Sequence, residues 1–167
     1  MTAFGDVGKI LHGLLQVQMT DEFTAAQQYT AIAVYFDSAG LGQLARRFHT
    51  LADIERHHAL GIIEFLLGRG YPVQVGGIGE IASTFTSPQN AVEFILRREH
   101  DTTGRITQLS RLARFGDDYL ADRFVQALLA DQVEHTARVM TLLTEIYATN
   151  GDLAEIDDYA GRDYVRV

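Results

Sequence analysis

A chain of 167 residues, 47% of them hydrophobic, is long enough to fold as one domain, residues 1–167, around a sizeable buried core. The absence of cysteine excludes disulfides, iron–sulfur clusters and thiolate zinc sites. The net charge of −8 argues against nucleic acid as a partner and favours the attraction of cations.

Residues 1–15 contain no apolar segment followed by a small-residue cleavage site, so we predict no signal peptide, no membrane span and a cytoplasmic location. A helix is predicted over residues 6–36, because buried-type residues recur there at steps of three and four. Residues 37–40 form a short turn, which makes the next helix an antiparallel neighbour. The stripe of the first helix comprises Leu11, Leu15, Gln18, Glu22, Ala25, Tyr29, Ile32 and Phe36.

The helix predicted over residues 41–67 has the same spacing, but two members of its stripe are polar. Glu55 and His58 stand three residues apart and therefore on one face. Burying a lone charged carboxylate is costly unless it is paired or bound to a metal ion, so we expect a partner for this pair inside the bundle. The apolar members of the stripe are Leu41, Leu44, Phe48, Leu51, Ile62 and Phe65.

Residues 71–87 differ in kind from the helical segments. Val73 and Val75 alternate with a polar residue as in a short strand, whereas Gly76, Gly77 and Gly79 would break a helix. Roughly seventeen residues at up to ~3.3 Å each can span a bundle, so we expect a long crossover that leaves the next helix parallel to the preceding one. A disordered loop or a small hairpin is the alternative.

Two long helices and a short one are predicted after the connector. Ser87 and Pro88 supply an N-cap and a first-turn proline for a helix over residues 88–115. Gly116 marks a turn, and a helix over residues 118–149 and a short fifth helix over residues 153–162 follow. The two long stripes comprise Val92, Ile95, Glu99, Thr102, Ile106, Leu109 and Ala113, and then Ala121, Val125, Leu128, Gln132, His135, Val139, Leu142 and Ile146.

Each long helix thus holds polar residues within an otherwise apolar stripe. In both hairpins these residues are equidistant from the turn, which brings them to one height, about 25 Å along each helix. Carboxylate and imidazole ligands without thiolate suit iron, manganese or zinc, and we expect two ions because Glu55 can bridge between them. A purely structural polar network is the alternative. The converging residues are Glu22, Glu55, His58, Glu99, Gln132 and His135.

This pattern resembles the ferritin superfamily over nearly the whole chain. Ferritin-like carboxylate proteins place one glutamate on each of two helices and a Glu-x-x-His motif on each of the other two. Glu22 and Glu99 match the single glutamates, and residues 55–58 (Glu-Arg-His-His) are a complete motif. Residues 132–135 (Gln-Val-Glu-His) keep the histidine but have glutamine in place of glutamate. Residues 22–29 and 35–37 are most similar to bacterial non-haem ferritins.

The resemblance implies a ferroxidase centre that binds two iron ions per subunit. Glu55 would bridge the two ions, and Tyr29 matches a tyrosine beside the centre, a hydrogen-bonding or electron-donating neighbour. A plain core tyrosine is the alternative. Bacterial non-haem ferritins usually have a carboxylate where His135 stands, whereas bacterioferritins have a histidine there but glutamate at position 132. The chain therefore looks like a hybrid of the two families. The residues assigned to catalysis are Glu22, Glu55, His58, Glu99, Gln132, His135 and Tyr29.

Other positions match the family only in part. Arg56 stands where bacterioferritins have a haem-binding methionine, so we expect no haem. Asp131 and Glu134 remain as weaker metal-binding candidates from a third iron site, two of whose acids are replaced here. Asp122 matches an acid of the pores through which iron enters, whereas Val125 replaces a second one. The histidines predicted to lie on the surface are His12, His49, His57 and His100.

The resemblance further implies iron storage. Fe(II) would be oxidised by O₂ or H₂O₂ at the centre, and ferric mineral would collect inside a homo-oligomeric cage, for which the fifth helix favours 24 subunits. A di-metal oxidase or peroxidase of the rubrerythrin-like kind, without storage, is the alternative enzyme. A non-catalytic bundle whose buried polar groups fix its register is a third possibility. No nucleic acid or membrane partner is expected.

Overall fold

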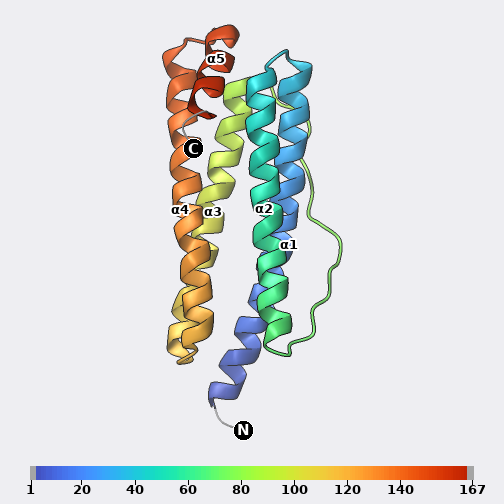
Figure 1. The fold of residues 1–167 in the computed structure, drawn as a ribbon, viewed down its shortest axis with the longest axis vertical. Helices are drawn as coiled ribbons and strands as arrows, with labels where there is room; N and C mark the ends of the chain where they lie inside the picture. Colours follow the sequence, from blue (N-terminus) through green and yellow to red (C-terminus); the bar gives the residue numbers. More distant parts are fainter. Residues whose placement is uncertain (1–2, 165–167) are drawn as a thin grey trace.

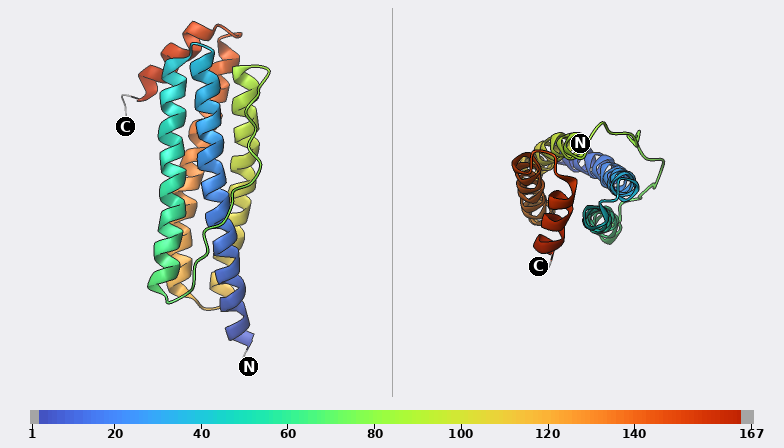
Figure 2. Two further views of the ribbon diagram at one scale, coloured as in Figure 1. Left: turned by 90° about the vertical axis from the view of Figure 1, so that its right-hand side faces the viewer. Right: turned by 90° about the horizontal axis from the view of Figure 1, so that it is seen from above.

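The computed structural model describes residues 3–164, which contain five α-helices and form no strand. Four long helices, α1 (Ala3–Ser38), α2 (Gly42–Gly68), α3 (Pro88–Phe115) and α4 (Tyr119–Ala148), form a bundle (Figure 1). The short α5 (Leu153–Tyr164) lies across one end of it (Figure 2). The predicted all-α bundle with a long connector and a short fifth helix is confirmed. The predicted domain limits remain a prediction, and residues 1–2 and 165–167 lie outside the described residues.

Local signals in the sequence fix where the helices begin and end. Gly40 closes the α1–α2 turn with a φ of 77°, in the left-handed region that glycine adopts without steric cost. The side chain of Ser87 accepts the N–H of Asn90 at 3.0 Å, which caps α3 ahead of its first-turn proline. Asp118 caps α4 by accepting the N–H of Ala121 at 3.0 Å. The short turns make α1–α2 and α3–α4 antiparallel hairpins (Figure 1).

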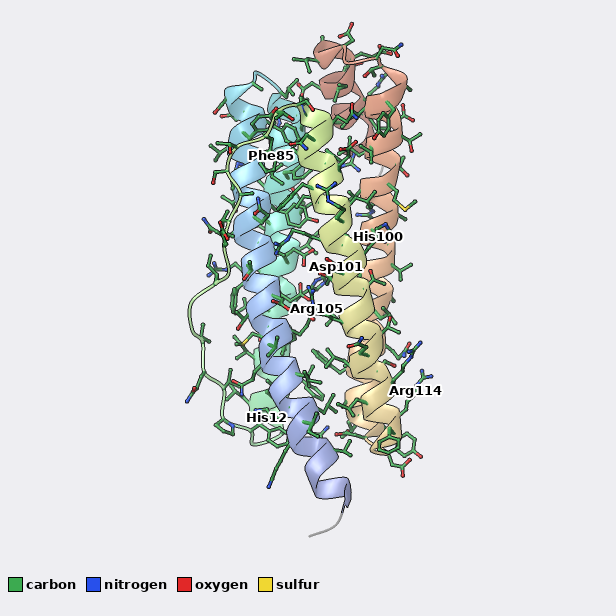
Figure 3. All side chains as sticks on the ribbon, turned by 180° about the vertical axis from the view of Figure 1, so that it is seen from behind. His12, Phe85, His100, Asp101, Arg105 and Arg114 are labelled. Carbon is green, nitrogen blue, oxygen red and sulfur yellow. The ribbon has the colours of Figure 1, made fainter. Side chains whose placement is uncertain are left out.

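The connector between α2 and α3 runs along the outside of α1 for most of the bundle's length (Figure 2). The side chain of Gln28 holds it at both polar groups of Ala82, donating to the carbonyl at 2.7 Å and accepting the N–H at 2.8 Å. Near the α3 end of the connector, the ring of Phe85 (labelled in Figure 3) packs against that of Tyr35, with ring centroids 5.4 Å apart. The predicted crossover is therefore confirmed, and α2 and α3 run in the same direction.

The apolar core consists of two clusters. One, which includes Phe36, Phe48 and Ile95, fills the end of the bundle near α5. The other, which includes Leu15 and Ile62, fills the opposite half. Between them lies the layer that holds the polar residues of the stripes, so these residues sit at the middle of the bundle. None of the described helices is long and apolar enough to cross a membrane.

A contact between distant parts of the chain docks α5. The Oδ1 atom of Asp157 accepts the backbone N–H groups of Gln43 at 2.8 Å and Leu44 at 3.0 Å. The first turn of α2 has no acidic residue, and Leu41 at its N-cap position makes no side-chain cap. Asp157 of α5 therefore supplies both the capping oxygen and the negative charge that the positive end of the α2 dipole favours.

Candidate metal centre

The structure brings the five predicted ligand residues into one buried layer. Glu22 comes from α1, Glu55 and His58 from α2, Glu99 from α3 and His135 from α4. The three glutamates are 1%, 1% and 4% exposed in chain order, and His135 is 5% exposed. Three carboxylates that are buried this deeply stay ionised only if they have positively charged partners.

One group of ligand atoms belongs to Glu22, Glu55 and His58, and these atoms all lie within 4.8 Å of one another. Nδ1 of His58 lies 3.5 Å from Oε2 of Glu55 and 3.9 Å from Oε2 of Glu22. The other ring nitrogen, Nε2, faces the exposed carboxylate of Asp131 at 3.7 Å. The group thus offers two carboxylates and one imidazole to a cation.

A second group belongs to Glu55, Glu99 and His135, again with ligand atoms within 4.8 Å of one another. Nδ1 of His135 lies 2.8 Å from Oε1 of Glu55 and 3.7 Å from Oε2 of Glu99. Glu55 belongs to both groups and turns one oxygen toward each histidine. Glu55 could therefore contribute one oxygen to each of two metal ions if both groups were occupied.

Four of the converging atoms are buried without a hydrogen-bond partner. They are Oε2 of Glu22, Oε1 of Glu55, Nδ1 of His58 and Nδ1 of His135. The 2.8 Å approach between His135 and Glu55 also lacks the geometry of a hydrogen bond. Buried polar atoms are normally paired, so lone pairs that converge without one indicate cation binding rather than a satisfied polar network.

The electrostatic states of the three glutamates differ. Burial and the nearby charge of Glu55 raise the pKa of Glu22 well above its usual value. Burial also raises the pKa of Glu99, although His135 acts against this. Burial alone would raise the pKa of Glu55, but its contacts with His135 and His58 lower it below the usual value. Metal ions and protons therefore compete for Glu22 and Glu99, whereas Glu55 is ionised throughout the neutral range.

Three uncharged side chains hold the carboxylates in place. Nε2 of Gln18 donates to Oε1 of Glu22 at 2.7 Å. The hydroxyl of Tyr29 donates to Oε1 of Glu99 at 2.5 Å, and Nε2 of Gln132 donates to the other oxygen, Oε2, at 2.5 Å. Each of these hydrogen bonds orients a metal-ligand carboxylate and leaves lone pairs free for a cation.

A cavity of about 140 Å³ between α2 and α4 reaches the centre from the surface. Its lining includes both histidines, His58 and His135, together with Asp131, Glu134 and Arg138. Glu134, one of the weaker metal-binding candidates, pairs with Arg138 at 2.5 Å, and neither it nor Asp131 belongs to the two ligand groups among the described residues. Sequence reasoning missed Arg138, although its spacing of four residues from Glu134 was a usable signal.

The remaining predicted positions lie away from the centre. Asp122, matched to a pore acid, is held by the guanidinium of Arg114 at 3.0 Å, and Val125 is fully buried. Figure 3 shows Arg114 near the end of α3 and His12 at the lower part of α1, both far from the middle of the bundle. His49, His57 and His100 are exposed, as predicted.

Comparison with known proteins shows what the chain is similar to. Residues 13–148 match the family described as ferritin-like domain. The chain is 39% identical over 163 residues to the protein named Ferritin BfrB of Mycolicibacterium smegmatis. The matched region covers 98% of this chain and 90% of that protein. It is 31% identical over 135 residues to a bacterial non-heme ferritin of Staphylococcus epidermidis, with 81% of each chain covered.

A solved structure gives the same relation. The open pore ferritin of Archaeoglobus fulgidus has a TM-score of 0.87 and 27% sequence identity, covering 90% of this chain and 94% of its own. The profile match covers all four long helices except the first residues of α1. This chain therefore belongs to the ferritin family of iron-storage proteins.

Proposed function

We propose that this chain is a ferroxidase that binds two Fe(II) ions per subunit, oxidises them and passes the ferric product to a stored mineral. The observation that carries the proposal is the pair of ligand groups that share Glu55, four of whose converging atoms are buried without a hydrogen-bond partner. Glu22 and His58 complete one iron position, and Glu99 and His135 complete the other. Oxygen and imidazole ligands suit iron in both oxidation states.

The reaction is balanced by the two ions together. Each Fe(II) gives up one electron, and the two electrons with two protons reduce O₂ to H₂O₂, or reduce H₂O₂ to two molecules of water. The three glutamates carry −3 against +4 for two ferrous ions, so the loaded centre keeps a net charge of +1. A centre that is undercharged in this way binds its ferric product weakly and favours its release. The cavity beside His58 and His135 is the route to the surface.

The assembly belongs to the same proposal. Large apolar side chains are exposed at the α3–α4 turn, where Phe115, Tyr119 and Leu120 are 76%, 78% and 69% exposed. Exposed apolar clusters of this kind are typical of surfaces that pack against other subunits. We propose a homo-oligomeric cage of 24 subunits in the cytoplasm, without haem because Arg56 replaces the haem-binding methionine.

The test is aerobic addition of Fe(II) to the metal-free protein, followed by sizing and iron analysis. We expect soluble iron far beyond two ions per chain, in a particle of several hundred kilodaltons. Glu55→Gln should abolish rapid oxidation, whereas Glu64→Gln on the exposed face of the same helix should not. Turnover with peroxide but without stored iron would favour the rubrerythrin-like alternative, and no bound metal would favour a structural bundle.

A further inference from the structure

His135 is the one ligand whose second ring nitrogen is enclosed by the protein. Its Nε2 lies 3.1 Å from the hydroxyl oxygen of Tyr29, and Tyr29 itself is fully buried. The ring of Tyr29 packs against that of Phe48, with centroids 5.7 Å apart, so the hydroxyl is held in place. His58 differs, because its Nε2 faces the exposed carboxylate of Asp131 at 3.7 Å, where water has access.

The hydroxyl proton of Tyr29 is used in a hydrogen bond to Glu99. A carboxylate that binds a metal ion is ionised and only accepts hydrogen bonds, so in the loaded centre the 2.5 Å contact with Oε1 of Glu99 uses the single hydroxyl proton of Tyr29. The tyrosine oxygen can then only accept from Nε2 of His135. A neutral imidazole that carries its proton on Nε2 has its lone pair on Nδ1, the atom that faces Glu55 and Glu99.

We propose that Tyr29 is a positioning residue that fixes the tautomer of His135, so that Nδ1 is presented as a metal ligand in the second iron position. The inference rests on the proposed di-iron centre and adds a role for a specific hydroxyl group. It assigns the role to one side of the centre only. In the first position, Nε2 of His58 faces the solvent-exposed carboxylate of Asp131 and not the hydroxyl of Tyr29, so that position does not depend on Tyr29.

The test uses Co(II), which does not undergo the oxidation, with the assembled protein under anaerobic conditions. Tyr29→Phe keeps the ring and removes only the hydroxyl. Tyr35→Phe is the matched control, because this tyrosine lies on the same helix and outside the centre. We expect the wild type and Tyr35→Phe to bind two Co(II) ions, and Tyr29→Phe to bind the second about ten- to a hundredfold more weakly with the first unchanged. The step that is absent from His135→Ala identifies the second position.

Solid-state NMR of sedimented, ¹⁵N-histidine-labelled, Zn(II)-loaded wild type gives a direct spectroscopic readout. We expect a hydrogen-bonded proton on Nε2 of His135, lost in Tyr29→Phe and kept in Tyr35→Phe. A proton on Nδ1 in the wild type would overturn the inference even if Tyr29→Phe fails to fold. Equal weakening of both Co(II) steps, or no weakening, would also overturn it. A wild type that binds no Co(II) would instead refute the proposed function itself.

Discussion

Replacing Gln132 by glutamate changes its amide nitrogen into an oxygen and adds one negative charge beside Glu99. In the structure, Nε2 of Gln132 donates to Oε2 of Glu99 at 2.5 Å and lies 3.3 Å from the Glu99 backbone carbonyl. The Gln132→Glu variant loses this donor and brings a fourth carboxylate to the centre. The total charge of the ligand set then becomes −4, which balances two divalent ions.

The expected size of the effect follows from two opposing contributions. With two divalent ions the present centre has a net charge of +1, and an added negative charge at about 4 Å contributes about 4 kcal/mol at an effective dielectric constant of about 20. Loss of the charge-assisted hydrogen bond to Glu99 costs about 1.5–3 kcal/mol. The balance of about 1–2.5 kcal/mol corresponds to second-site binding that is about five- to seventyfold tighter.

Isothermal titration calorimetry with Zn(II) measures the affinity of the second metal position, and iron analysis after oxidation and dialysis measures how much Fe(III) the centre retains. We expect Gln132→Glu to bind the second Zn(II) more tightly and to retain Fe(III) at the centre, which the wild type releases. Gln132→Met is the matched control, because it loses the same hydrogen bond without adding charge, and it should bind the second ion more weakly. If the wild type and Gln132→Glu retain Fe(III) equally, the charge argument is wrong.

Two further predictions concern the fold and its pH dependence. Asp157→Ala should weaken the docking of α5 and the start of α2 by about 0.5–2 kcal/mol, because two backbone N–H groups lose their acceptor, with faster hydrogen exchange there as the readout. Asp158→Ala, which removes only an exposed pair with Arg162, should leave exchange unchanged; equal effects would contradict the capping role. Burial, and after it the charge of Glu55, raise the pKa of Glu22 in the folded state above its unfolded value. The contribution of Glu22 to the stability of the metal-free protein is therefore fully present below its unfolded pKa, and it is lost as the pH rises through its folded pKa. The stability of metal-free Glu22→Gln relative to wild type should therefore increase between about pH 4.5 and pH 7, as measured by denaturant midpoints, and a constant difference would refute this assignment.

The periodicity of the sequence was sufficient to predict the helices and the height of the polar layer in the bundle. Helical spacing is a local property, because residues three and four apart share a face whatever the rest of the chain does. Glu55 and His58 could therefore be assigned to one buried stripe, and the length of the connector indicated the crossover. The tertiary structure then placed Glu22, Glu99 and His135 around that pair.

Spacing along one helix carries no information on which atoms meet across helices. The division of Glu55 between two groups, the hydrogen bonds of Gln132 and Tyr29 to Glu99, and the 3.1 Å contact of Tyr29 with His135 all depend on side-chain orientations set by packing. The same holds for Asp157, which caps a helix more than a hundred residues away in the chain.

Helical periodicity and residue type were enough to predict the class of fold, the set of candidate ligands and their common depth in the bundle. The folded arrangement was needed to show which oxygen or nitrogen of each residue faces the centre and which neighbour holds it there. Burial patterns follow from the regular geometry of one helix, whereas hydrogen bonds and metal-ligand geometry depend on the relative positions of four helices at once.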